Sequence, residues 1–120
     1  MKRHDPGSDH DRMLDLVEYC SRLVELPGSR TFDDFMSDDS AGWEFRAAVY
    51  HGVYIVCEIV KNLSAETKSL YPADWTLIIR MRDKLAHHYD KVDYGILWET
   101  MIIHIPDLLG KISPSVEQDS

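Results

Sequence analysis

The segment from residue 40 to residue 63 constrains the fold most, because it is apolar along two sides when it is drawn as a helix. One stripe contains Trp43, Ala47, Tyr50, Tyr54 and Cys57, and the other contains Phe45, Val49, Gly52, Val56, Val60 and Leu63. A helix that is apolar on two sides is normally buried on two sides. We expect one stripe to face the core of the chain and the other to face a partner, for which a second copy of the chain is the simplest candidate. Between the stripes, Glu44, His51 and Glu58 recur every seven residues, and a line of this kind is most simply a solvated seam.

Elsewhere in the chain, apolar residues also recur at steps of three and four, which predicts further helices. No alternating pattern typical of a β-strand is present in the sequence. The fold that we expect is therefore all-α, an up-and-down bundle of four main helices. Besides the segment 40–63, the expected helices begin at residue 9 or 10 and end at 26, and span 75–88 and 94–112. A short helical turn is expected at 32–36, and a loop that can include one turn is expected over 64–72.

Residues at the expected helix ends support these boundaries. Pro27-Gly28-Ser29 should end the first helix, and Thr31 with Asp34 has the spacing of a capping box. Asp74 can cap the helix that begins at Trp75. Pro106 removes one backbone hydrogen bond from the last helix, so we expect a kink there.

With 120 residues the chain is expected to form one domain, 10–112, between loose tails at 1–9 and 113–120. No apolar run approaches the ~20 residues that cross a bilayer, so no membrane partner is expected. The polar amino terminus lacks the apolar core of a secretory signal. Cys20 and Cys57 both lie in apolar stripes, which favours reduced core cysteines of a cytoplasmic protein over a disulfide.

The net charge is −8, from 13 basic and 21 acidic side chains. General nucleic-acid binders are usually basic, because they gain affinity by neutralising phosphates. This charge argues against a protein that coats RNA broadly, and no DNA partner is expected. A small site that cleaves RNA stays possible if a few basic groups are focused in one place.

The stretch 82–89, with the sequence RDKLAHHY, concentrates the most reactive side chains of the chain. Arg82 shares a helix face with Ile78 and Leu85, and an arginine on an apolar face is costly unless its guanidinium is paired or reaches a ligand. The structural alternative is an internal ion pair, with Glu58 as the expected partner. His87 lies five residues after Arg82, about 140° around the helix and ~7.5 Å along it, so both would border a common cleft.

RNA cleavage would give these side chains a chemical role, although a histidine near a helix end is also a common dipole partner. A neutral imidazole can take the proton of a ribose 2′-hydroxyl, because its pKa lies near the working pH. A guanidinium can stabilise the charge that then develops on the attacked phosphate. No metal or other cofactor is needed, and the sequence offers no convincing carboxylate cluster for a metal.

The pattern Arg82-x4-His87-x-Tyr89 resembles the signature of the HEPN-type ribonucleases, and the flanking residues narrow the resemblance to the HepT-like toxins. The resemblance extends from Asp11 to about Ile112. It includes Phe32-Asp33-Asp34-Phe35, Glu58, Trp75, Met81-Arg82-Asp83, Val92-Asp93-Tyr94, Leu97-Trp98-Glu99 and Ile105-Pro106-Asp107-Leu108. The chain differs from the usual pattern at Cys57, Asp83 and His88.

This resemblance implies a HEPN four-helix bundle that acts as a homodimer and cleaves RNA without a metal. It implies catalytic roles for Arg82 and His87. We expect Glu58, Asp83 and His88 to be supporting or substrate-binding residues beside them. It further implies a toxin–antitoxin pair of the HepT/MntA type. In such a pair a minimal nucleotidyltransferase silences the toxin by attaching AMP at the position of Tyr89.

Two other readings of the same residues stay open. The bundle could be a non-catalytic module that docks a nucleotidyltransferase and binds nucleotide or phosphate at the same cluster. It could also be a purely structural helical dimer with a buried arginine pair. Tyr89 itself, with an apolar ring and a polar tip, could be an ordinary residue at the rim of a cleft.

Overall fold

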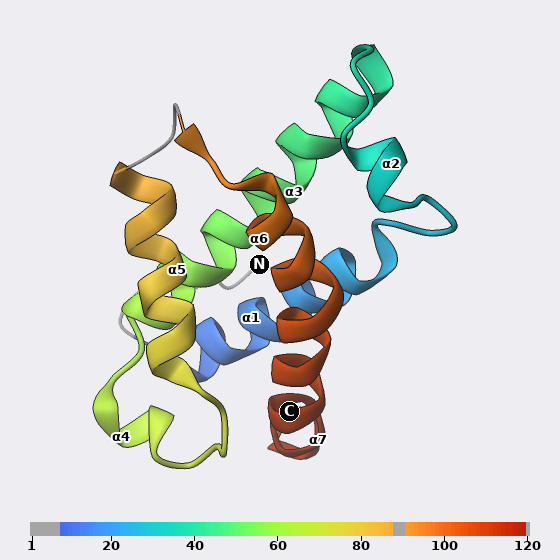
Figure 1. Cartoon of the computed structure of the whole chain (residues 1–120). Coiled ribbons are helices and arrows are strands. Elements are labelled where there is room, and N and C mark those ends of the chain that lie inside the picture. Colours follow the sequence, from blue (N-terminus) through green and yellow to red (C-terminus); the bar gives the residue numbers. More distant parts are fainter. Residues whose placement is uncertain (1–7, 88–90, 120) are drawn as a thin grey trace.

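The structure is a computed structural model that describes residues 8–87 and 91–119. Over these residues the chain is helical and contains no strand, so the predicted all-α bundle is confirmed (Figure 1). Four short or irregular elements accompany the long helices. The elements are α1 (Asp9–Glu25), α2 (Phe32–Phe35), α3 (Ser40–Lys61), α4 (Ala65–Lys68), α5 (Trp75–His87), α6 (Tyr94–Glu99), the π-helical turn η2 (Thr100–His104) and α7 (Ile105–Asp119).

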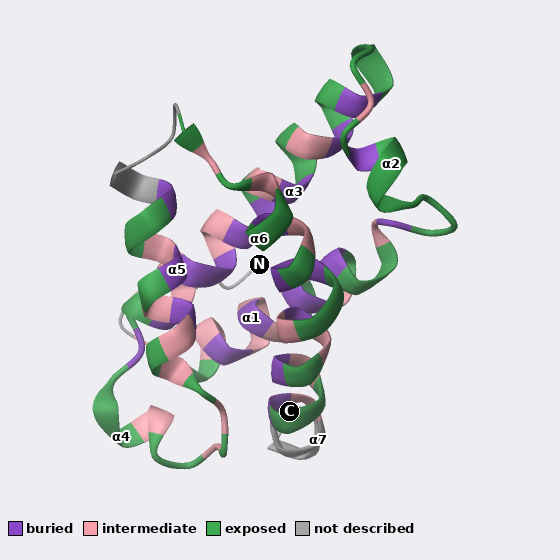
Figure 2. Cartoon of the chain, in the orientation of Figure 1, coloured by how far each residue is buried: buried purple, intermediate pink, exposed green. Residues whose placement is uncertain are grey.

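The bundle is organised around α1 and α3, which pack against each other. The other face of α1 meets α7, whereas α3 meets α5 (Figure 1). Buried residues occur along all four long helical segments (Figure 2). The core consists of Met13, Leu16, Cys20, Leu23, Phe35, Phe45, Val49, Val53, Val56, Cys57, Val60, Leu63, Ile78, Met81, Leu85, Leu97, Met101, Ile105, Leu108 and Ile112.

The two apolar stripes predicted for α3 have different surroundings. Every member of the stripe from Phe45 to Leu63 is buried, and Gly52 in this stripe brings α3 so close to α1 that an added Cβ would lie 2.7 Å from Leu23 Cδ2. In the other stripe Cys57 is buried, but Trp43 is 66% exposed and Tyr50 is only half-buried. One stripe therefore builds the core, and most of the other lies at the surface of the single chain.

Side chains cap the helices at several predicted positions. Thr31 and Asp34 form the capping box at α2, and Asp74 Oδ1 accepts a hydrogen bond of 3.1 Å from the backbone N–H of Leu77 in α5. Asp39 caps α3 by accepting a hydrogen bond of 2.8 Å from the Gly42 N–H. Because these contacts satisfy donors that a helix leaves unpaired, they fix where α2, α3 and α5 begin.

The last helical segment is irregular just before Pro106, near where the sequence predicted a kink. The irregularity takes the form of a π-helical turn, Thr100–His104, which the sequence analysis did not predict. Pro106 has no N–H to donate to the preceding turn, which accounts for the disturbed hydrogen bonding there. The apolar face predicted for this segment, from Leu97 to Ile112, is buried on both sides of the turn.

Both ends of the helical region lie outside the limits expected for the domain. Asp9, expected at the boundary between the loose amino-terminal tail and the first helix, is the first residue of α1, whose N-cap is Ser8. At the other end α7 runs through Asp119, although residues 113–120 were expected to form a loose tail. None of the described helices is both long enough and apolar enough to cross a membrane.

Candidate active site

Arg82 lies on the side of α5 that packs against α3. Its neighbours on the same face, Ile78 and Leu85, are buried in the core, and the Arg82 side chain is 18% exposed. The guanidinium reaches across to α3, where Nη2 lies 3.2 Å from Oε1 of Glu58. The ion pair that the sequence analysis raised as a structural alternative is therefore present in the single chain.

This ion pair does not satisfy the whole guanidinium. Nη1 lies 3.4 Å from Oδ1 of Asp83, at the long end of hydrogen-bond range. Nε is buried and has no hydrogen-bond partner in the part of the chain that the structure describes. A guanidinium carries five N–H donors, so several of the Arg82 donors are left over after the contacts with Glu58 and Asp83.

The charges of the pair are mutually stabilised. Burial raises the pKa of Glu58, but the hydrogen bonds from Tyr54 and Arg82 outweigh it, so that the pKa is lowered overall. The hydrogen bond to Glu58 raises the pKa of Arg82, and a hydrogen bond to the same carboxylate raises the pKa of Tyr54. At neutral pH the cluster therefore contains a carboxylate, a guanidinium and a protonated phenol.

A second tyrosine of α3 contacts the same helix nearer to its carboxyl end. The hydroxyl of Tyr50 donates a hydrogen bond of 2.8 Å to the backbone carbonyl of Leu85. The sequence analysis placed Tyr50 and Tyr54 in an apolar stripe and missed these polar contacts. The spacing of four residues from Tyr50 to Tyr54 to Glu58 was the available signal, because residues four apart are neighbours on a helix.

The structure places the backbone of His87 in the last described turn of α5, one and a half turns after Arg82. The His87 side chain, and His88 and Tyr89 altogether, lie outside the described residues. The structure thus brings Arg82, Glu58 and Asp83 together, and the roles of His87, His88 and Tyr89 stay predictions.

A cleft of about 310 Å³ opens beside this end of α5. Its lining includes the apolar Met81, Leu85 and Leu97 together with Lys84 from α5 and Lys91 from the following connection. The lining also contains Asp93, and it does not include Arg82. The two lysines give this cleft more positive than negative charge, although the chain as a whole carries a net charge of −8.

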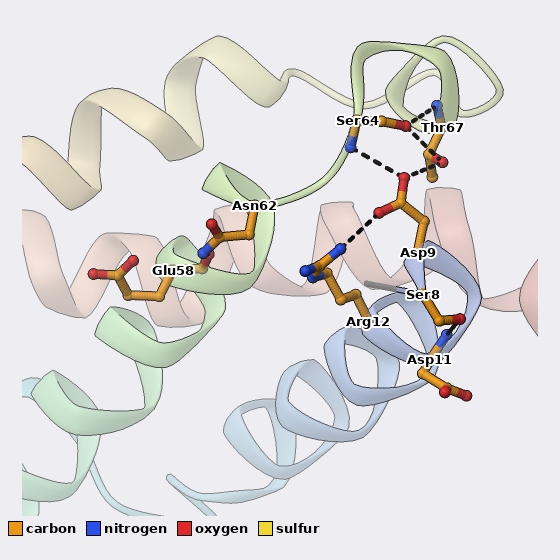
Figure 3. Close-up of polar contacts among 8 residues, drawn as sticks. All are labelled: Ser8, Asp9, Asp11, Arg12, Glu58, Asn62, Ser64 and Thr67. Carbon is orange, nitrogen blue, oxygen red and sulfur yellow. Dashed lines mark hydrogen bonds and ion pairs between the residues drawn. The ribbon is translucent and has the colours of Figure 1, made fainter. Parts of the chain in front are cut away.

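A separate polar cluster joins α1 to the turn at α4 (Figure 3). Oδ2 of Asp9 accepts hydrogen bonds from the Ser64 N–H (3.1 Å) and the Thr67 hydroxyl (2.6 Å), and Oδ1 accepts one from Arg12 (3.0 Å). Those hydrogen bonds, led by the ones from Ser64 and Thr67, hold the pKa of Asp9 well below its usual range. The carboxylate of Glu58 points away from this cluster, so the two polar sites are distinct (Figure 3).

The two cysteines are free and buried. Burial raises the pKa of both Cys20 and Cys57 to about 12, so both are neutral thiols at physiological pH. A buried neutral thiol is a poor nucleophile, and these residues therefore belong to the core and not to a reactive site. No group of three or more His, Cys, Asp or Glu side chains among residues 8–87 and 91–119 is arranged to hold a metal ion.

The structure is thus an all-α bundle with a largely buried, incompletely paired arginine on α5 and a cleft with two lysines near the carboxyl end of the same helix. Comparison with known proteins identifies its family: the model described as "Ribonuclease HepT-like" matches residues 16–114. The chain belongs to the HepT-like ribonuclease family. This confirms the resemblance seen in the sequence.

Individual relatives cover nearly the whole chain. A protein of Thermococcus cleftensis that is named as a probable ribonuclease HepT is 35% identical, over 87% of this chain and 92% of its own length. A protein of Caldanaerobacter subterraneus subsp. tengcongensis, with a provisional name as an RNase, is 31% identical over 99% of both chains. Another provisionally named RNase, from Methanocaldococcus jannaschii, is 29% identical over 88% of this chain and 84% of its own length. No solved structure matches the chain.

Proposed function

We propose that this protein is a metal-independent endoribonuclease, the toxin of a HepT/MntA-type toxin–antitoxin system. Membership of the HepT-like family and the ribonuclease names of its relatives support the reaction class. The main support in this chain is the hydrogen bonding of Arg82. This arginine is largely buried, and Glu58 and Asp83 do not satisfy all the N–H donors of its guanidinium. A purely structural buried ion pair is normally satisfied at every donor, because each unpaired buried group costs free energy.

The proposed reaction uses His87 as the base and Arg82 as the phosphate-binding cation. The neutral imidazole of His87 takes the proton from a ribose 2′-hydroxyl, and the 2′-oxygen attacks the adjacent phosphorus. The bond from phosphorus to the 5′-oxygen breaks, and the leaving oxygen takes up a proton from the medium. Donors of Arg82 stabilise the added negative charge of the phosphorane, while Lys84 and Lys91 attract the phosphodiester to the cleft.

Glu58 has an electrostatic role in this scheme. Its carboxylate orients the guanidinium of Arg82 at 3.2 Å while Tyr54 holds the carboxylate in turn. An arginine that is oriented before substrate binds loses less conformational entropy when it contacts the phosphate. Asp83 restrains the same guanidinium more weakly, and His88, which follows the base in the sequence, is a second candidate for proton transfer.

The active form that we propose is a homodimer in which the Arg82 and His87 clusters of two chains border one site. The exposed part of the stripe on α3 supports this, because Trp43 is 66% exposed and Tyr50 and Tyr54 are half-buried. Large aromatic side chains are enriched where two protein surfaces meet. A second chain that covers this stripe would bury it beside α5, the helix that carries Arg82 and His87.

The regulation that we propose is the attachment of AMP to the Tyr89 hydroxyl by a minimal nucleotidyltransferase. Tyr89 follows His87 by two residues, so an adenylyl phosphate there would enter the neighbourhood of Arg82. That phosphate would pair with the guanidinium through the same charge-assisted hydrogen bonds that bind the RNA phosphate. The modified toxin would then be blocked by both charge and bulk.

A non-catalytic binding module is the second candidate, and a specific observation favours it. The Arg82 guanidinium already has Glu58 as an anionic partner in the single chain. Such a pair would be present if the arginine were structural, or if a bound nucleotide or phosphate replaced Glu58 as its partner. Such a module would dock the nucleotidyltransferase and bind nucleotide or phosphate at the same cluster without cleaving RNA.

RNA cleavage by purified protein decides between the two candidates. The wild type should cleave single-stranded RNA in the presence of a chelator, and Arg82→Ala and His87→Ala should each lose at least about two orders of magnitude of activity. Arg80→Ala is the matched control, because Arg80 is exposed on the same helix two residues away. Full cleavage by either site variant would remove the proposed mechanism, and a wild type that binds nucleotide but leaves RNA intact would establish the binding module.

A further inference from the structure

Tyr50 makes a contact that none of the roles above requires. Its hydroxyl crosses from α3 to α5 and donates to the carbonyl oxygen of Leu85 at 2.8 Å, two residues before His87. Burial raises the pKa of Tyr50, so the phenol keeps its proton at neutral pH. A carbonyl oxygen has two lone pairs, so that Leu85 can accept this bond in addition to any bond within the helix.

This contact is one end of a polar ridge on α3, which we define as Tyr50, Tyr54 and Glu58. The three residues are spaced by four and therefore lie along one face of the helix. The rings of Tyr50 and Tyr54 are stacked, with centroids 6.3 Å apart and planes inclined by 4°. The ridge meets α5 at two points, Glu58 with Arg82 and Tyr50 with Leu85, which shows that the two helices run antiparallel.

The two contacts fix the sliding and the rotation of α5 relative to α3. The ion pair alone anchors one residue through a long and flexible side chain, and it leaves the following turn free to fray. The hydrogen bond from Tyr50 anchors the backbone itself one turn further on, by way of a side chain with only two rotatable bonds before the ring. Without it, the turn that carries His87 is held to α3 by apolar contacts, which are not directional.

We propose that Tyr50 is a positioning residue for the RNA-cleaving site: by holding the Leu85 carbonyl it fixes the distance between the base on His87 and the guanidinium of Arg82. The inference rests on the proposed ribonuclease function. It assigns Tyr50 no contact with RNA. Proton transfer requires the imidazole within hydrogen-bond reach of the 2′-hydroxyl while the phosphate is bound at Arg82, so a displacement of the turn by a fraction of an ångström slows the chemical step.

The variant Tyr50→Phe tests this, because it removes only the hydroxyl and keeps the stacked ring. Tyr71→Phe is the matched control: Tyr71 is also half-buried, but it lies before the other end of α5 and its hydroxyl makes no hydrogen bond to any residue in the described ranges. With an RNA substrate, kcat of Tyr50→Phe should fall about ten-fold while KM changes less than about two-fold, because the phosphate contact of Arg82 is kept. The control should match the wild type in both constants.

Amide hydrogen exchange of residues 82–87, measured without RNA, gives a second readout that does not depend on activity. In Tyr50→Phe the exchange of these amides should be about five-fold faster, whereas that of α1 should be unchanged. Unchanged exchange at residues 82–87, or an unchanged kcat with faster exchange, would overturn the positioning role, as would a uniform increase in exchange that marks a general loss of stability. A wild type that cleaves no RNA would overturn the ribonuclease proposal instead, and exchange would still decide whether Tyr50 holds the turn.

Discussion

Replacement of Asp9 by asparagine is the most direct test of the polar cluster that joins α1 to α4. The carboxylate accepts three hydrogen bonds, two at Oδ2 from Ser64 and Thr67 and one at Oδ1 from Arg12. An asparagine of the same shape can turn its oxygen toward Ser64 and Thr67, but its NH₂ group then faces the guanidinium of Arg12. The substitution therefore removes one hydrogen bond and the charge that strengthens the other two.

The expected loss follows from these contacts. A neutral hydrogen bond contributes about 1 kcal/mol to stability and a charge-assisted one about twice as much. The Asp9 side chain is 22% exposed, so solvent weakens both kinds of contact and the smaller contributions apply. We expect the free energy of unfolding of Asp9→Asn to be lower by about 1–2 kcal/mol. For a chain of this length that corresponds to a melting temperature lower by about 3–8 °C.

Thermal unfolding followed by circular dichroism measures this difference, with the exposed Asp38→Asn as the charge-matched control. The pH dependence of this stability difference tests whether the Asp9 carboxylate is its source. Because the folded pKa of Asp9 lies below the unfolded value of 3.8, its contribution is fully present above about pH 4 and is lost as the pH falls toward the folded pKa. The difference between wild type and Asp9→Asn should be constant from pH 7 to pH 5 and shrink below pH 4. Equal melting temperatures at pH 7, or a difference that persists undiminished at pH 2, would refute the reasoning.

Four further outcomes are expected. Light scattering at micromolar concentration should give about twice the chain mass of 13.9 kDa, and a clean monomer would contradict the shared site. After incubation with the cognate nucleotidyltransferase and ATP, mass spectrometry should find an adenylyl group on the peptide that contains Tyr89, with RNA cleavage nearly abolished; adenylyl mass on another peptide, or undiminished cleavage, would count against the switch. Gly42→Ala should destabilise the fold by about 2 kcal/mol or more in chemical denaturation, because the new Cβ would lie 2.0 Å from the backbone oxygen of Ser37. Gly52→Ala should cost less, since the atom it meets is the movable end of Leu23 and alanine favours the helix.

The helices could be predicted from the sequence because their apolar periodicity and their caps agree. Cys20 was expected in the core because it lies in an apolar stripe, and it is buried. The pair Thr31 and Asp34 identified the short helix α2 through local hydrogen bonds alone. The π-helical turn could not be predicted in this way. The apolar residues around it keep spacings of three and four, and a wider turn changes the hydrogen bonds without changing that pattern.

The candidate site was predictable in part. An arginine on an apolar helix face demands a partner, which led to the Arg82–Glu58 pair before the structure was known. Tyr50 was assigned to an apolar stripe, because the spacing of apolar residues shows which helix face its ring lies on. That spacing does not show which atom its hydroxyl contacts. Asp9 was expected only at the boundary between the tail and the first helix, and its contacts were not predicted, because its partners Ser64 and Thr67 are more than fifty positions away in the chain. Contacts of that kind depend on tertiary packing, which local sequence rules do not contain.

The π-helical turn at Thr100–His104 acts as a one-residue length adjustment within the last helix. A turn of this kind takes in one more residue than an α-helical turn, and the buried residues on its two sides, from Leu97 to Ile112, still follow one another at spacings of three and four. Leu97 before the turn and Leu108 after it both remain buried, while Ile102 and Ile103 within it are exposed. The deletion of either exposed isoleucine would convert this turn to an ordinary α-helical one without rotating α7 away from α1. A homologous chain that is shorter by one residue at this point can therefore keep the same core. A one-residue gap here in an alignment would mean that the π-helical turn is replaced by an α-helical turn, and it would not mean that a loop is missing.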